Sequence, residues 1–102
     1  MKVCELDTPA LLVDREIMMD NIRAMQNRAN RKGVALRPHT KTHKTPAIAL
    51  IQRDCGCKGI AVAKLGEAEV MADAGFDDIF IANEIVGDIK MKRLRKLAQS
   101  IK

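Results

Sequence analysis

Short aliphatic runs alternate with longer helical patterns along this chain, and that alternation limits the folds open to it. The runs cover residues 34–36, 60–63 and 79–82, and Gly or Asp residues lie close to each of them. Continuous apolar runs of this length are typical of strands in a parallel sheet, because helices cover both faces of such a sheet. The sequence therefore predicts buried strands at these three places.

The stretches between the runs carry helical spacing. Apolar residues at positions 18, 22, 25 and 29 follow Asp14, a possible N-cap, and precede Gly33. A second helix is expected to start at Thr45 and Pro46, a cap followed by a first-turn proline, and to end before residue 56. Further helices are predicted over residues 66–74 and 91–101, and a short strand over residues 11–13. This order implies right-handed βα crossovers and a parallel sheet.

The predicted fold class is α/β. Three parallel strands are few for a complete domain, because a (β/α)₈ barrel has eight strands in about 250 residues. The two outer strands would also keep unpaired backbone edges. We therefore expect residues 1–102 to form one partial domain, namely the first three βα units of a (β/α)₈ barrel, preceded by a short strand and a helix. The alternative is a small α/β domain that dimerises.

Composition narrows the choice of partners. The formal net charge is +5, but Trp and Tyr are absent and the only aromatic residues are Phe76 and Phe80. The stacking platforms that bind single-stranded nucleic acid are therefore missing, and we expect no nucleic-acid partner. No apolar run approaches the 20 or so residues of a membrane span, and the first residues lack the apolar core of a signal peptide. We expect a cytoplasmic protein with reduced cysteines and no membrane partner.

The densest set of ionisable groups is RPHTKTHK at residues 37–44, directly after the first predicted strand. Ligands bind at the carboxyl ends of strands in parallel α/β folds, so this position suits chemistry. In an extended segment Arg37, His39, Lys41 and His43 would project to one side. Neighbouring cations and partial burial would disfavour the ammonium form of a lysine there, which makes its amine nucleophilic. The alternative is a solvated basic turn, and the pattern alone does not choose between Lys41 and Lys44.

Two other strand ends carry polar residues. Asn83 follows the third predicted strand, where its amide could donate a hydrogen bond to a cofactor oxygen, although Asn is also an ordinary turn residue. Lys64 ends the second predicted strand, and we expect it to be a capping residue or to pair with Glu67 or Glu69 rather than to bind a ligand.

A metal site is not expected. His39 and His43 could be combined with Cys55 and Cys57, but one residue separates the two cysteines, whereas structural zinc sites use two to four. The two pairs would also lie at opposite ends of a helix about 15 Å long.

Motifs in four places resemble one known family. They are DTPALLVD at residues 7–14, LRPHTKTHK at 36–44, AKLGEAEVM at 63–71 and IANE at 81–84. Together they resemble the N-terminal region of the D-threonine aldolase and D-serine dehydratase group. The resemblance implies an alanine-racemase-like barrel that binds pyridoxal 5′-phosphate, with Lys41 as the Schiff-base lysine and Lys44 as a flanking residue. We place Lys41, His39 and Asn83 in the cofactor site, with His39 and His43 as candidates for tuning the lysine.

The resemblance also implies a function. Members of the group are lyases that act on small D-amino acids, by retro-aldol cleavage or by elimination of water. They continue into the rest of the barrel and then into a β-domain that binds a divalent metal and that residues 11–13 would join. We therefore expect an N-terminal part of such an enzyme, inactive alone and a homo-oligomer at full length. The alternatives are a truncated non-catalytic fragment or interaction domain, and a pyridoxal phosphate carrier without turnover.

Overall fold

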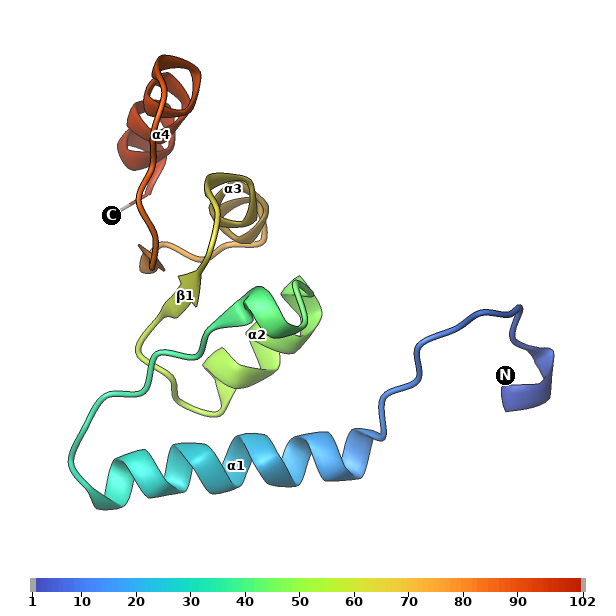
Figure 1. Cartoon of the computed structure of the whole chain (residues 1–102). Helices are drawn as coiled ribbons and strands as arrows, with labels where there is room; N and C mark the ends of the chain where they lie inside the picture. Colours follow the sequence, from blue (N-terminus) through green and yellow to red (C-terminus); the bar gives the residue numbers. More distant parts are fainter. Residues whose placement is uncertain (1, 102) are drawn as a thin grey trace.

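The computed structural model describes residues 2–101, so the two ends of the expected domain, residues 1 and 102, lie outside it. Four α-helices and two strands follow in the order α1, α2, β1, α3, β2, α4 (Figure 1). Their bounds are α1 Arg15–Arg31, α2 Pro46–Asp54, β1 Ile60–Val62, α3 Leu65–Asp73, β2 Ile79–Ile81 and α4 Asp88–Ser100, with 3₁₀ turns η1 Val3–Glu5 and η2 Thr40–Thr42.

Strands β1 and β2 are parallel and in register, with Ile60 opposite Ile79 and Ala61 opposite Phe80. Helix α3 connects them, which confirms the predicted βα order. A third extended segment lies along the other edge of β1. There the Lys58 N–H donates to the carbonyl of Leu36, and the Ala61 N–H donates to that of Pro38, both at 2.8 Å. His39 forms a parallel bridge with Ala61. Strand β1 is therefore the centre of three parallel chain segments.

The predicted first strand at residues 34–36 is wrong. The structure has no strand there, and Val34 is exposed. Helix α1 ends at Arg31, Gly33 turns the chain with a φ of 63°, and Val34 still donates to the Ala29 carbonyl at the end of that helix. The chain therefore reaches β1 only from Leu36 onward, and residues 36–39 replace the predicted strand.

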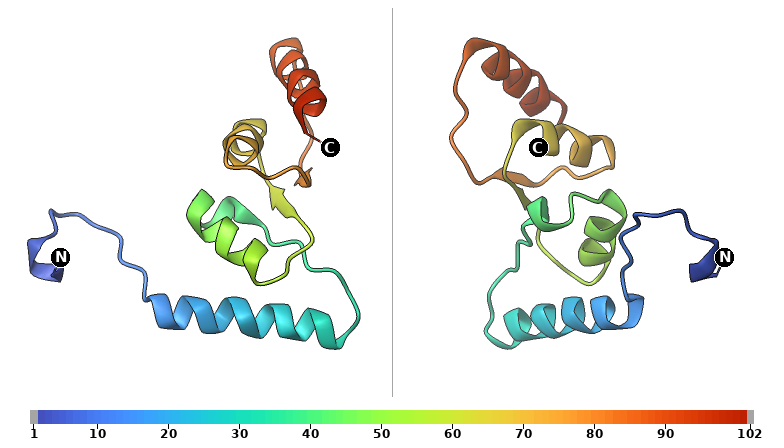
Figure 2. Two further views of the ribbon diagram at one scale, coloured as in Figure 1. Left: turned by 180° about the vertical axis from the view of Figure 1, so that it is seen from behind. Right: turned by 45° about the vertical axis from the view of Figure 1, so that its right-hand side comes forward.

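The predicted strand at residues 11–13 is also wrong. These residues are irregular and exposed, and Leu11 is fully accessible to solvent. A strand needs a neighbour for its N–H and C=O groups. Within residues 2–101 no strand lies beside this segment. The first residues instead extend away from the remainder of the chain (Figure 2).

The helix predictions are confirmed, with small shifts at the ends. The Asp14 carboxylate accepts from the Ile17 N–H at 3.0 Å and caps α1, and Pro46 occupies the first turn of α2. Thr45 does not cap α2 with its side chain, because its hydroxyl donates to the carbonyl of His43 at 2.7 Å. Helix α4 begins at Asp88, three residues before the predicted start at 91.

The core lies between the strands and the helices. Ile60 and Val62 of β1 are fully buried, and they pack with the remaining core residues Ala49, Ala68, Met71 and Phe76. Residues that alternate with them face the other side of the sheet. On that side Phe80 of β2 is 57% exposed. The sheet is thus covered on its helical face and open on the face that carries Phe80.

An ion pair crosses the amino-terminal end of the sheet. Arg37 Nη1 lies 2.7 Å from Asp78 Oδ1, and Arg37 Nη2 donates to Asp78 Oδ2 at 3.0 Å. The same guanidinium donates to the carbonyls of Ile60 and Asp78. Hydrogen bonding to Arg37 is the main cause that lowers the pKa of Asp78. Arg37 therefore ties together all three chain segments of the sheet.

The molecule is less compact than an ordinary domain of its size. Its radius of gyration is 15.9 Å, and its principal extents are 47 × 41 × 21 Å. A compact chain of this length has a radius of gyration of roughly 13 Å. The open sheet face and the extended N-terminal segment account for the difference. In the part that the structure describes, no helix combines the length and the apolar character needed to cross a membrane.

Candidate active site

Lys41 lies in the 3₁₀ turn η2, which follows the extended segment 36–39 and sits at the carboxyl end of β1. Thr40, at 1% exposure, anchors this turn, because its hydroxyl donates to the carbonyl of Ala61 at 3.3 Å. The side chain of Lys41 is exposed, and among residues 2–101 it forms no ion pair. The structure thus places the amine at the strand end, as expected, but the partial burial expected for it is not observed.

The expected alternation of side chains along residues 37–43 is wrong, because the chain turns at η2 instead of staying extended. Arg37 is held by Asp78 at the opposite end of the sheet. The ring of His43 contacts residues at the start and in the second half of α2. Its Nδ1 accepts from the Thr45 N–H at 3.0 Å, and its Nε2 lies 3.3 Å from Gln52 Oε1. With Nδ1 as acceptor, Nε2 carries the proton and donates to Gln52. His43 is therefore a structural residue of this loop.

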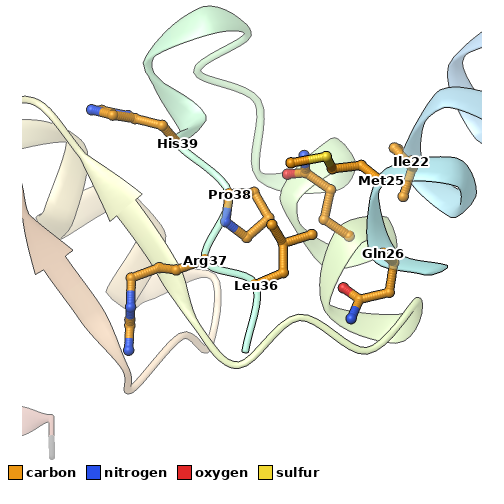
Figure 3. Close-up of a pocket in the computed structure, with 8 residues that line it drawn as sticks. Ile22, Met25, Gln26, Leu36, Arg37, Pro38 and His39 are labelled. Carbon is orange, nitrogen blue, oxygen red and sulfur yellow. The ribbon is translucent and has the colours of Figure 1, made fainter. Parts of the chain in front are cut away.

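His39 is the histidine that contacts the Lys41 segment. Its Nδ1 accepts from the Lys41 N–H at 3.3 Å, so the neutral ring carries its proton on Nε2. The bridge and the strand register place His39, Ala61 and Phe80 in one row across the sheet. Figure 3 shows His39 pointing away from Leu36 and Pro38, whose side chains lie towards α1 and α2, although His39 also contributes to the lining of the cavity of about 240 Å³ on that side. His39 therefore belongs to the open face of the sheet.

Asn83 lies two residues beyond β2, exposed, with its side-chain oxygen accepting from the Glu84 N–H at 3.1 Å. It lines a groove of about 560 Å³ at the carboxyl ends of β1 and β2, together with Lys44, Lys64 and Glu67. Lys41 and His39 do not line this groove. The structure thus brings Asn83 to the same edge of the sheet as Lys41, but not into one pocket with it.

Glu67 is the residue of this edge that the sequence prediction missed. Its Oε2 accepts from the Ala63 N–H at 2.8 Å, and its Oε1 lies 3.3 Å from Lys44 Nζ. Burial raises the pKa of Glu67, but the Ala63 N–H and Lys44 together lower it by more. The net effect is a lowered pKa. Glutamate at the third position of a helix commonly accepts from backbone N–H groups before that helix. That rule could have singled out Glu67 at the start of α3.

Lys64 takes the predicted capping position at the start of α3, but its expected ion pair with Glu67 or Glu69 is wrong. Glu67 pairs with Lys44, and Glu69 pairs with Arg93 of α4. Lys64 occupies the N-cap position of α3, is exposed and forms no ion pair within residues 2–101. The pairing follows from the fold, since the turn of the chain at η2 brings Lys44 to Glu67.

Among the described residues, no three His, Cys, Asp or Glu side chains are grouped so that they could hold a metal ion. The cysteines are free thiols, with Cys4 exposed and Cys55 and Cys57 partly buried.

The hydroxyl of Thr40 is expected to stabilise the fold. Thr40→Val keeps the side-chain shape but removes the buried hydrogen bond to Ala61, which should lower the free energy of unfolding by about 1–2 kcal/mol. Thr42→Val is the matched control, because the Thr42 hydroxyl is exposed and donates at 3.4 Å to His39. Urea denaturation of both variants checks this, and equal losses would contradict the anchoring role of Thr40.

Comparison with known proteins decides the family. The family model of the alanine racemase N-terminal domain matches residues 13–100. The chain belongs to this family. A D-threonine aldolase of Arthrobacter sp. is 46% identical over 100 residues, which are 98% of this chain and 26% of that protein. A D-threo-3-hydroxyaspartate dehydratase of Delftia sp. is 48% identical over 77 residues, 76% of this chain and 20% of the relative.

The solved structures agree with this assignment to the alanine racemase N-terminal domain family. The crystal structure of D-threonine aldolase from Filomicrobium marinum matches 98% of this chain with a TM-score of 0.95 and 43% identity. The chain covers 27% of that structure. The resemblance stated from the four sequence motifs is thus confirmed, and so is the α/β fold class. The chain spans about a quarter of the length of the relatives that it matches.

Proposed function

We propose that this chain is the cofactor-holding N-terminal part of a pyridoxal-phosphate-dependent lyase that acts on small D-amino acids with a β-hydroxyl group. One observation carries the proposal: Lys41 offers an exposed amine on a turn fixed at the carboxyl end of β1, in a chain 46% identical to a D-threonine aldolase. The carboxyl ends of parallel strands are where such folds bind their ligands.

The residues present fit the cofactor. Pyridoxal phosphate is an aldehyde, and an amine that no carboxylate pairs with is available to bind it. Lys41 and Lys64 meet that condition within residues 2–101, whereas Lys44 is held by Glu67. The family resemblance of residues 36–44 favours Lys41 over Lys64. His39 would present its Nε2–H on the open face of the sheet, and the Asn83 amide would donate from the neighbouring strand end. Pyridoxal phosphate, once bound, draws electrons from the substrate nitrogen and weakens the bonds at Cα.

Protein groups then select the bond that breaks. Lys41, which would hold the cofactor, would also offer its Nζ as a proton acceptor beside the substrate. Retro-aldol cleavage needs that proton to leave the β-hydroxyl, whereas elimination of water needs it to leave Cα. We propose Lys41 Nζ as the acceptor in either case. The divalent metal implied by the family resemblance would be held by the β-domain, which the resemblance places outside residues 2–101.

The test is an assay of the longer gene product, meaning the full-length protein of which this chain is proposed to be the N-terminal part. D-Threonine and D-serine are supplied separately, with and without added divalent metal, and glycine, acetaldehyde and pyruvate are measured. Glycine with acetaldehyde indicates aldol cleavage, and pyruvate from D-serine indicates elimination. If neither substrate is consumed under any of these conditions, the proposed lyase function is rejected.

The chain of 102 residues alone is expected to lack turnover and to self-associate. It supplies Lys41, but phosphate sites in such barrels commonly lie after strands seven and eight, and residues 2–101 contain only the strands β1 and β2. Its sheet edges and exposed Phe80 favour association with further chains. Size-exclusion chromatography should show species larger than the 11.3 kDa monomer. A stable monomer with measurable lyase activity would contradict both expectations.

A further inference from the structure

The turn that carries Lys41 closes in an unusual backbone conformation. Lys44 has a φ of 49°, the left-handed region that residues with a Cβ seldom adopt. Its N–H donates to the carbonyl of Thr40 at 2.7 Å, and the His43 N–H donates to the same carbonyl at 3.2 Å. The conformation of Lys44 therefore decides whether the turn around Lys41 stays closed, and an unfavourable conformation needs contacts that hold it.

The side chain of Lys44 supplies such a contact. Its Nζ lies 3.3 Å from Oε1 of Glu67, whose Oε2 accepts from the Ala63 N–H directly after β1. The Lys44 side chain is 59% exposed and that of Glu67 only 12% exposed. The mostly buried carboxylate thus links the far end of the Lys41 turn to the end of the central strand. Thr40 makes the corresponding link at the near end of the turn through Ala61.

We propose that Glu67 is a positioning residue, which holds the Lys41 turn closed over the end of β1 through its ion pair with Lys44. The proposal rests on the proposed role of Lys41 as the cofactor lysine. Glu67 does not touch the amine of Lys41. It acts through Lys44, and its effect is to keep the reactive amine in one place on the sheet edge.

The experiment compares two carboxylates of helix α3 in the full-length protein of which this chain is proposed to be the N-terminal part. Glu67→Gln removes the charge that faces Lys44 but keeps an oxygen that can accept from Ala63, and Glu67→Ala removes both contacts. Glu69→Gln is the matched control, because Glu69 pairs with Arg93 of α4 rather than with the turn. Lys44→Met removes the partner charge, and Lys44→Arg retains it.

The first measurement is amide hydrogen exchange at His43 and Lys44. We expect exchange to become about three- to fivefold faster in Glu67→Gln and Lys44→Met, the scale of a partly exposed ion pair. Glu67→Ala should exchange at least as fast. Glu69→Gln and Lys44→Arg should match the unmodified chain. Unchanged exchange in both Glu67 variants, or equal acceleration in Glu69→Gln, would overturn the proposal.

The second measurement is the share of pyridoxyl label that borohydride fixes on Lys41 when the same full-length protein is incubated with pyridoxal phosphate. This share should fall in Glu67→Gln by a similar factor and stay unchanged in Glu69→Gln. Faster exchange with an unchanged share on Lys41 would show that Glu67 has only a structural role, which overturns the proposal. Label spread evenly over all lysines of the unmodified full-length protein would instead contradict the role of Lys41. The exchange rates would still decide whether Glu67 holds the turn.

Discussion

Gly59→Ala is expected to destabilise the fold by about 3 kcal/mol, the upper part of the range for overpacking a buried site. A Cβ at position 59 would lie 2.5 Å from the carbonyl oxygen of Asp78 and 2.5 Å from Arg37 Nη1. The guanidinium could shift only by leaving its ion pair. The carbonyl cannot retreat, because it accepts from the Ile60 N–H in the parallel sheet at 3.1 Å. Glycine is thus required here by close approach of neighbouring groups.

Gly66→Ala is the matched control for this prediction. The nearest atom to a Cβ at position 66 is Arg93 Nη2, at 4.0 Å, and Gly66 lies in the first turn of α3. Alanine favours helix over glycine, so this variant should be as stable as the parent chain or slightly more stable. Urea denaturation of both variants gives the comparison. Equal stability of Gly59→Ala and Gly66→Ala would contradict the account of the Arg37 and Asp78 pair.

Local signals in the sequence were sufficient for most of the helices and for two strands. Asp14, Gly33 and Pro46 mark helix ends through chemistry that acts within a few residues, and the structure confirms them. The continuous apolar runs predicted strands at β1 and β2 correctly, but the burial predicted for both is observed only in β1, because Phe80 of β2 lies on the open face and is 57% exposed. Elements whose limits depend on neighbouring residues in sequence were therefore predictable.

The wrong prediction of a first strand at residues 34–36 shows why the other elements could not be predicted. Its apolar residues Val34 and Ala35 connect α1 to the sheet and are exposed, whereas the more polar residues after Leu36 lie beside β1. Pairing of a strand depends on where the chain meets its neighbour, and periodicity carries no information about that. The segment at residues 11–13 has strand-like composition but no neighbouring strand in the part of the chain that the structure describes.

The candidate site was also predicted only in part. The position of Lys41 at a strand end follows from βα order, which the sequence reports. The turn η2 depends on the hydrogen bond from Thr40 to Ala61, 21 residues away. No local sequence pattern predicts this hydrogen bond. Lys44 reaches Glu67 only because the chain turns at η2. The sequence does not reveal this turn, so it suggested Lys64, which is closer in sequence, as the lysine near Glu67.

Lys41→Ala in the longer gene product is expected to lower lyase activity by about a thousandfold or more, the scale on which a positioned proton acceptor contributes. The loss should be larger than that of a general base alone, because the same amine is proposed to hold the cofactor. Lys32→Met is the control, since Lys32 is an exposed residue at the end of α1. Near-parental activity of Lys41→Ala would contradict both roles of this lysine.

The most direct measurement is borohydride reduction of the longer gene product with pyridoxal phosphate, followed by peptide mapping. Reduction fixes the cofactor on the amine that holds it, so the labelled peptide identifies the lysine. The account predicts the pyridoxyl mass on Lys41, which the exposed turn at the end of β1 leaves without a carboxylate partner among residues 2–101. Label on Lys44 or Lys64 in place of Lys41 would contradict it.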